Sequence, residues 1–180
     1  VRTIPRTLSN AHWFPSPLPT DERQNIPSLT YLGKLSHTGE LVNEQDNEEV
    51  RQERPYALYR AKMRQGGSGD EVNVVVKFTA HYHEDAHRML AEEQLAPTLH
   101  FCIHLFGDMY MVIMDYVEGT SLYFTQEELR DREKIYNDVE RAVKLLHEQD
   151  LVFGDLRVQN IVSRPDGGAM LIDFDWAGNP

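Results

Sequence analysis

The chain has 180 residues, enough for one domain with its own core or for two small lobes that share a cleft. Hydrophobic residues make up 41% and charged residues 26%, as in ordinary globular proteins, and no apolar run approaches the about 18 residues of a membrane span. The 18 basic and 29 acidic residues give a formal charge of −11, which disfavours nucleic acid as a partner.

The first half of the chain contains an irregular arm followed by strand-like segments. Residues 1–28 hold five of the nine prolines and show no hydrophobic period, which predicts a proline-rich arm. Strands are predicted at Leu29–Leu35 and Tyr56–Met63, separated by a solvated, acidic and amide-rich loop at Glu40–Arg54. After a turn rich in glycine, the β-branched run Val72–Phe78 is typical of a buried strand.

A helix and a strand pair are predicted next. Apolar residues at three- and four-residue steps indicate a helix over His83–Leu95, and Pro97 is expected to end it. Two strands, His100–Phe106 and Met109–Asp115, flank the turn at Gly107-Asp108. The pattern therefore indicates a sheet with one helix inserted before its last two strands.

The last third of the chain is predicted to contain a long helix and a small hairpin. Thr125 and Glu128 have the spacing of a capping box. The helix that follows carries a periodic apolar stripe, formed by Ile135, Val139, Ala142, Val143 and Leu146. Short strands at Ile161–Ser163 and Ala169–Ile172 are joined by a turn with two glycines.

Three polar residues near the end of the chain have a spacing suited to phosphoryl transfer. Asn160 lies five residues after Asp155, and Asp173 follows thirteen residues later at the end of a predicted strand. A hairpin between Asn160 and Asp173 would bring both side chains to one metal ion. Phosphoryl transfer needs such oxygen ligands, together with an acid that positions the nucleophile and a cation on the phosphates.

Three features follow one another along the chain: the strand lysine Lys77, the Met-Asp-Tyr-Val-Glu-Gly segment and these acidic motifs. In this order, the chain resembles the protein-kinase-like superfamily, and in particular the kinase-like domains common in fungal genomes. The Ile-Asp-Phe-Asp-Trp-Ala-Gly segment also resembles aminoglycoside and choline kinases. The resemblance implies an α+β fold. An antiparallel-sheet small lobe with one helix is expected at residues 29–118, followed by the beginning of a helical large lobe at 119–180.

The resemblance also implies ATP and Mg²⁺ as cofactors. Lys77 would hold the α- and β-phosphates, oriented by Glu84 or Asp85 from the following helix; Glu92 and Glu93 are less favoured for that role. Met114 would be the gatekeeper. The backbone of Asp115, Tyr116 and Val117 would form the hinge that meets adenine.

The same resemblance assigns roles around the expected catalytic loop. Asp155 would accept or orient the proton of the acceptor hydroxyl, and Arg157 would neutralise the γ-phosphate. Asn160 and Asp173 would bind Mg²⁺, with Asp175 supporting a second metal ion. The implied activity is transfer of the γ-phosphate to a hydroxyl, on protein Ser/Thr or on a small alcohol.

The chain departs from the family pattern at three places. Phe153-Gly154 stands where His-Arg usually precedes the catalytic aspartate, and Asp-Phe-Asp replaces Asp-Phe-Gly. The phosphate loop has only Gly33 and Gly39 near its usual place. These departures favour an alternative: a pseudokinase or truncated kinase-like module that binds nucleotide or a partner without transfer.

A competing motif lies at the predicted helix over His83–Leu95. His83, Glu84 and His87 match the His-Glu-x-x-His pattern of zinc peptidases, which makes a zinc hydrolase a remote alternative. The charged Asp85 inside the motif is unusual for such helices. The default expectation is therefore a pair of surface histidines.

The chain ends and the cysteine content bear on location and partners. Cys102 is the one cysteine, so no disulfide forms within the chain. The given sequence does not open on a basic segment followed by an apolar one, the pattern of a secretion signal. Both features favour an intracellular location, in the cytoplasm or nucleus. The chain stops soon after Asp173, so we expect a fragment of a longer protein or a partner chain that covers the exposed face of the large lobe.

Overall fold

The computed structural model describes residues 15, 17–21, 26–36, 39, 41, 57–64, 70–123, 131–165 and 167–180. Four expectations lie outside these residues: most of the proline-rich arm, nearly all of the loop at Glu40–Arg54, the glycine-rich turn before Val72, and the capping box of Thr125 and Glu128.

The described chain begins with three strands, β1 (Leu29–Lys34), β2 (Leu58–Arg64) and β3 (Glu71–Thr79), followed by helix α1 (Glu84–Glu92). After α1 come β4 (Leu99–Leu105), β5 (Met109–Asp115), the two-residue strand β6 (Thr120–Ser121) and helix α2 (Arg132–His147). A 3₁₀ turn (Val158–Asn160) then leads into β7 (Ile161–Ser163) and β8 (Ala169–Leu171).

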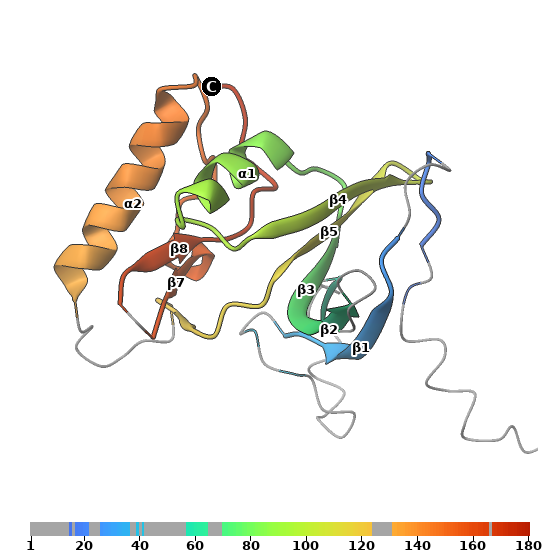
Figure 1. Ribbon diagram of the computed structural model, residues 1–180. Coiled ribbons are helices and arrows are strands. Elements are labelled where there is room, and N and C mark those ends of the chain that lie inside the picture. Colours follow the sequence, from blue (N-terminus) through green and yellow to red (C-terminus); the bar gives the residue numbers. More distant parts are fainter. Residues whose placement is uncertain are drawn as a thin grey trace, which may run out of the picture.

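The strands form two antiparallel sheets. The larger sheet has the order β1-β2-β3-β5-β4, and the smaller one the order β6-β7-β8 (Figure 1). In the larger sheet Lys77 lies opposite Leu58 on one side and Val112 on the other. The five strands with helix α1 agree with the expected kinase-like small lobe.

Strand β3 places Lys77 on one face of the larger sheet and Val74 and Val76 on the other, because side chains along a strand point alternately to its two faces. Val74 and Val76 are fully buried. They pack with buried residues of the neighbouring strands: Ala61, Met63, Ile103, Leu105, Met111 and Ile113. The β-branched run in β3 therefore supports one core while it presents Lys77 on the opposite side.

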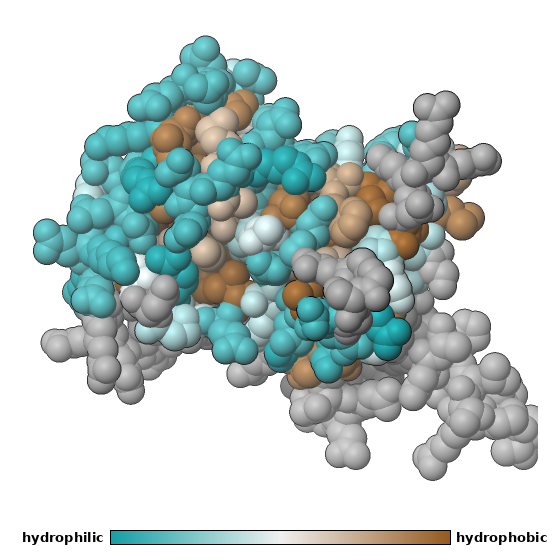
Figure 2. All heavy atoms as spheres, in the orientation of Figure 1, coloured by the Kyte–Doolittle hydropathy of each residue, from teal (hydrophilic) through white to brown (hydrophobic). Residues whose placement is uncertain are grey.

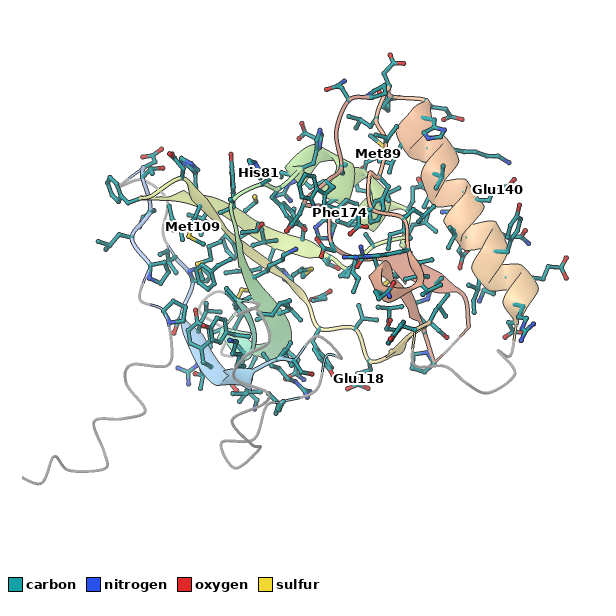
Figure 3. The ribbon with its side chains drawn as sticks, turned by 180° about the vertical axis from the view of Figure 1, so that it is seen from behind. His81, Met89, Met109, Glu118, Glu140 and Phe174 are labelled. Carbon is teal, nitrogen blue, oxygen red and sulfur yellow. The ribbon has the colours of Figure 1, made fainter. Side chains whose placement is uncertain are left out.

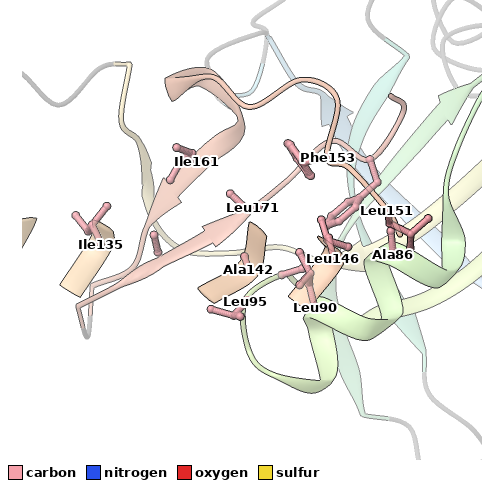
Figure 4. Close-up of a cluster of buried hydrophobic side chains, with 13 residues drawn as sticks. Ala86, Leu90, Leu95, Ile135, Ala142, Leu146, Leu151, Phe153, Ile161 and Leu171 are labelled. Atoms are coloured by element: carbon pink, nitrogen blue, oxygen red, sulfur yellow. The ribbon is translucent and has the colours of Figure 1, made fainter. Parts of the chain in front are cut away.

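A second core joins the two helices to the smaller sheet (Figure 4). Its buried residues include Leu90 of α1, Leu146 of α2 and Leu171 of β8. The polypeptide after α1 is tied to this region, because Leu171 N donates to Leu95 O at 2.8 Å. Arg141 of α2 adds an ion pair to Glu93 at 2.8 Å.

Helix α1 ends three residues before the expected Leu95. Gln94 has a left-handed φ of 59°, and Leu95 N bonds back to Leu90 O at 2.8 Å, which is how many helices terminate. Pro97 therefore does not end the helix; its carbonyl accepts a hydrogen bond from His87 Nε2 at 2.8 Å. The prediction of a helix was confirmed, but its end was misplaced.

Part of the proline-rich arm lies along the free edge of β4. Thr20 N donates to His104 O at 3.0 Å, and Phe106 N donates to Leu18 O at 3.3 Å. Pro19 faces Leu105 in an antiparallel bridge between these bonds.

In the described ranges, neither helix is long and apolar enough to cross a membrane.

Hydrophilic residues dominate the α2 side of the face in Figure 2, whereas hydrophobic residues show in its middle and toward the β4–β5 end. This distribution matches the amphipathic character of α2. Its Leu146 is completely buried, whereas Tyr136 lies largely in solvent.

Replacing Leu146 by Ala should destabilise the fold by about 2–5 kcal/mol, because it removes packed methyl groups from the second core and leaves a cavity. Chemical denaturation would measure the change. Tyr136→Ala, on the exposed side of the same helix, is the control and should change stability by less than about 0.5 kcal/mol. Equal effects of the two substitutions would contradict the orientation of α2.

Candidate functional site

A buried lysine forms the centre of the candidate site. Lys77 is only 7% exposed, yet its Nζ donates to Asp173 Oδ1 at 2.7 Å and to Asp175 Oδ1 at 2.6 Å. Thr79 Oγ1 donates to the second oxygen of Asp175 at 2.8 Å. Burying an ammonium group is tolerable only with such partners. The structure thus brings together Lys77, Asp173 and Asp175, which are about a hundred positions apart in the sequence.

The local geometry of two segments makes this cluster. Lys77 and Thr79 point to the same side of β3 because they are two residues apart on a strand. Asp173 follows β8 and has a left-handed φ of 73°, a conformation that aspartate tolerates better than most residues. Asp173 and Asp175 then both face Lys77, and Phe174 between them points away into the second core.

The charge balance of the cluster is uneven. Two carboxylates share one ammonium group. Burial, together with the nearby charge of Asp173, raises the pKa of the Asp175 carboxyl, although Lys77 and Thr79 oppose this shift. With both carboxylates ionised, the two of them outnumber the one ammonium group, and such an excess of negative charge suits a cation.

The expected catalytic loop lies beside this cluster. Asn160 Nδ2 donates to Asp155 Oδ2 at 2.9 Å and to its backbone carbonyl at 3.0 Å. Arg157 forms an ion pair with the same Oδ2 at 2.9 Å. Ile172 N bonds to Asn160 O at 2.9 Å, which fixes Asn160 next to the residue that precedes Asp173. The predicted hairpin geometry is therefore present.

The expected hinge residues run from the end of β5 into the following segment. Met114 is buried. Asp115 N and Tyr116 N bond to the carbonyls of Thr98 and Asn73. A cavity of about 400 Å³ borders Asp115, Tyr116 and Val117. Its other described walls come from the start of β3, the last turn of α1 with the segment after it, and Met170, and Lys77 does not line it.

The carboxylates expected from α1 lie elsewhere. Glu84 pairs with Arg88 one turn along the helix at 2.8 Å, and Asp85 is exposed. Among the described residues, the carboxylates paired with Lys77 are Asp173 and Asp175. The structure therefore does not bring Glu84 or Asp85 to the lysine.

The interpretation of His83 and His87 as zinc ligands is wrong. His87 is completely buried, and both of its ring nitrogens are engaged, Nε2 with Pro97 O and Nδ1 with the Tyr82 hydroxyl. His83 caps α1, because its Nδ1 accepts a hydrogen bond from Ala86 N at 3.1 Å. Within the described ranges no cluster of three His, Cys, Asp or Glu side chains is arranged to hold a metal ion. The default expectation of a surface residue also fails for His87.

His87 instead stacks on the phenylalanine of the Asp-Phe-Asp segment. Its ring lies parallel to Phe174 with the centroids 4.5 Å apart, and Phe153 meets the other side of Phe174 edge-on at 5.2 Å. Phe174 lies beside α1 in the interior (Figure 3). Burial lowers the pKa of His87 to about 4, so the ring is neutral at pH 7, with the proton on Nε2 facing Pro97 O.

Gly154, one residue before Asp155, is required by a close approach of two backbones. It has a left-handed φ of 77°, and a Cβ there would collide with the carbonyl of Trp176. The bridge between Val152 and Gly178 holds these two segments together. Any residue with a Cβ at position 154, arginine included, would therefore force one of the two backbones to shift. The sequence showed that Phe153-Gly154 replaces the usual His-Arg, but the close approach that requires the glycine could not be predicted from it.

The oxygen ligands present fit Mg²⁺ better than a transition metal. Asp173 offers a carboxylate, and Asn160, whose Nδ2 is committed to Asp155, keeps its amide oxygen for a cation. Mg²⁺ is usually held by one or two carboxylates plus substrate phosphates rather than by a cage of protein ligands. Asp175, expected to support a second ion, is committed to Lys77 and Thr79.

The buried state of His87 predicts a pH-dependent stability. Its folded pKa of about 4 lies below the ordinary 6.5, so its contribution is complete above pH 6.5 and is lost as the pH falls toward 4. The loss should amount to about 3 kcal/mol between these limits. Denaturation at several pH values should show this slope in the wild type and not in His87→Leu. His81→Gln, at an exposed position, should keep it.

Gly154→Ala should destabilise the protein by about 1–3 kcal/mol, because the new methyl group meets the Trp176 carbonyl in a strained backbone conformation. Gly107→Ala is a matched control: φ is 88° there, but no atom lies within 4 Å of the added Cβ. It should cost only the conformational part, about 1 kcal/mol. Thermal unfolding of both variants would measure the difference, and equal losses would refute the close approach.

Comparisons with known proteins give partial sequence matches to kinases and a kinase-like protein. The chain is 36% identical over 69 residues to the KEOPS complex subunit Bud32 of Pyrococcus abyssi, covering 37% of this chain and 31% of that protein. It is 34% identical over 82 residues to the eye isozyme of protein kinase C of Drosophila melanogaster, covering 43% of this chain and 12% of that protein. No protein-family model matches the chain. Over part of its length, the chain is thus similar to proteins of the protein-kinase-like superfamily.

Proposed function

We propose that the chain is the nucleotide-binding and catalytic-loop part of a Mg²⁺-ATP-dependent phosphotransferase. The observation that carries this proposal is the pairing of buried Lys77 with Asp173 and Asp175, beside the Asp155–Asn160 pair. Together these residues supply a cation for the phosphates, oxygen ligands for Mg²⁺ and a carboxylate for the acceptor. In this proposal, residues 29–118 form the small lobe and residues 119–180 begin the large lobe.

The proposed reaction is an in-line transfer to a hydroxyl. Lys77 holds the α- and β-phosphates, and Asn160 and Asp173 hold the ion, which neutralises the charge on the phosphate oxygens. Asp155 Oδ2 accepts a hydrogen bond from Asn160 Nδ2, which leaves Oδ1 for the acceptor hydroxyl. The acceptor oxygen bonds to the γ-phosphorus, the bond from that phosphorus to the β–γ bridging oxygen breaks, ADP leaves, and the hydroxyl proton passes to Asp155.

The remaining residues have supporting roles in this proposal. The base of ATP binds at the hinge formed by Asp115, Tyr116 and Val117, with Met114 as the gatekeeper. Arg157 is exposed at the catalytic loop and turns from Asp155 to the γ-phosphate when nucleotide binds. The proposed enzyme is intracellular and related to fungal kinase-like domains, and it shares features with aminoglycoside and choline kinases.

The proposed acceptor is a Ser or Thr side chain of a protein, with a small alcohol as the other candidate. A polypeptide partner is part of the proposal because Leu156, Val158 and Trp176 leave apolar surface next to Asp155, and Trp176 is 69% exposed. The net charge of −11 speaks against nucleic acid as that partner.

A second candidate function is a kinase-like module that binds nucleotide or a partner without transfer. One observation favours it: both acidic residues of the Asp-Phe-Asp segment are bonded to Lys77, so two of the three ammonium donors are already engaged and one is left for a phosphate. Asp155→Asn separates the two candidates, because it should abolish phosphotransfer but leave nucleotide binding and partner binding intact.

ATP with Mg²⁺ should raise the unfolding temperature of the chain. At about a hundred times the Kd, the gain corresponds to about 2.7 kcal/mol. The rise should disappear in Lys77→Ala and depend on Mg²⁺ through Asp173, so that Asp173→Ala loses the Mg²⁺-dependent part. A thermal-shift titration with and without Mg²⁺ measures both effects.

Each variant is compared with its own unliganded unfolding temperature, because removal of one partner also destabilises the buried cluster. Lys144→Ala, on the exposed side of α2, serves as the control for loss of a positive charge. A folded wild-type chain that shows no shift at millimolar ATP would refute the proposed function.

A further inference from the structure

The two carboxylates that contact Lys77 are not equivalent. Asp175 is held at both oxygens, by Lys77 at 2.6 Å and by Thr79 at 2.8 Å. Asp173 contacts Lys77 through Oδ1 at 2.7 Å, and its side chain is 34% exposed against 21% for Asp175. Asp175 is therefore the more firmly anchored and the less hydrated partner.

Thr79 makes this anchoring local to the strand of the lysine. Because it lies two residues beyond Lys77 on β3, its hydroxyl points to the same side of the sheet. The carboxylate of Asp175 spans these two side chains, so one rigid strand fixes the direction of both its oxygens. A bond from each oxygen restricts the carboxylate more than a single contact does.

Helix α1 supplies no competing carboxylate in the described structure. Glu84 is bonded to Arg88 and Glu93 to Arg141 of α2, and Asp85 and Glu92 are exposed. Lys77 thus depends on the segment after β8 for its orientation.

We propose that Asp175, fixed by Thr79, is the positioning residue of Lys77, in place of a carboxylate from helix α1. This inference rests on the proposed function, in which Lys77 holds the phosphates and Asp173 binds Mg²⁺. When Asp173 turns to the ion, Asp175 keeps the ammonium group aimed at the phosphates. Asp175 then acts through Lys77 and is not itself a ligand of the ion.

The orientation of Lys77 can be tested without any nucleotide. A limiting dose of an amine-acylating reagent is applied to the chain, and mass spectrometry compares acylation of Lys77 with that of Lys144, an exposed residue of α2. Asp175→Asn should increase the relative labelling of Lys77 about tenfold, the size expected for loss of one hydrogen bond between charged groups. Thr79→Val should increase it by a smaller factor of about three, since it removes only the anchor.

Two further variants serve as controls. Thr79→Ser keeps the hydroxyl and should restore wild-type labelling, whereas Glu84→Gln on α1 should leave it unchanged. Circular dichroism confirms that each variant is folded, and if Asp175→Asn is not, the Thr79→Val and Thr79→Ser pair decides. Unchanged labelling in folded Asp175→Asn, or an increase confined to Asp173→Asn, would overturn the inference.

Nucleotide binding separates a positioning role from a metal-binding role. Asp175→Asn should raise the Kd for ATP by the same factor with Mg²⁺ and with EDTA, whereas Asp173→Asn should raise it only with Mg²⁺. A Mg²⁺-specific loss in Asp175→Asn would make Asp175 an ion ligand and would overturn the inference. If the wild type binds no ATP, the proposed function fails, and the labelling of Lys77 still decides whether Asp175 and Thr79 orient it.

Discussion

The constraint on which the rest of the structure depends is the burial of the Lys77 ammonium group. A charge on the inner side of a sheet is tolerable only if carboxylates reach it, and here both come from the segment after β8. That segment can reach β3 only if β7, β8 and α2 pack against the end of α1. The contacts of Glu93 with Arg141 and of Leu95 with Leu171 hold them in that place. The ion pairs and the second core therefore require each other.

The Asp-Phe-Asp segment joins these two requirements in three residues. Its two carboxylates face Lys77, whereas Phe174 turns the other way and fills the space between His87 and Phe153. The neutral His87 is fixed by bonds to Tyr82 and Pro97, so its ring forms a firm surface for the phenylalanine. A backbone shift of this segment that carries both carboxylates away from Lys77 would also move Phe174 out of this aromatic packing. Chemistry and core packing are thus coupled at this point.

Local periodicity predicted the elements that depend mainly on nearby residues. The strands at Val72–Phe78 and Met109–Asp115 were predicted well, because β-branched runs and a glycine turn determine them locally. The two-residue strand β6 was missed because only its pairing with β7 defines it. The spacing of the polar residues indicated which residues share the site. The carboxylate partner of Lys77 could not be predicted from the sequence. Glu84 and Asp175 both carry a carboxylate, and only the folded chain decides which of them lies near the lysine.

The segment around Pro19 has a consequence for self-association. The outer edge of β4 would otherwise expose unpaired backbone groups, which are a template for pairing with another copy of the sheet. Leu18 and Thr20 take up bonds along that edge, and Pro19 has no N–H to offer to a further strand. This end of the β4 edge is therefore covered by a residue that cannot itself pair with a further strand. A short stretch of the proline-rich arm thereby takes up backbone groups that another copy of the sheet could otherwise use.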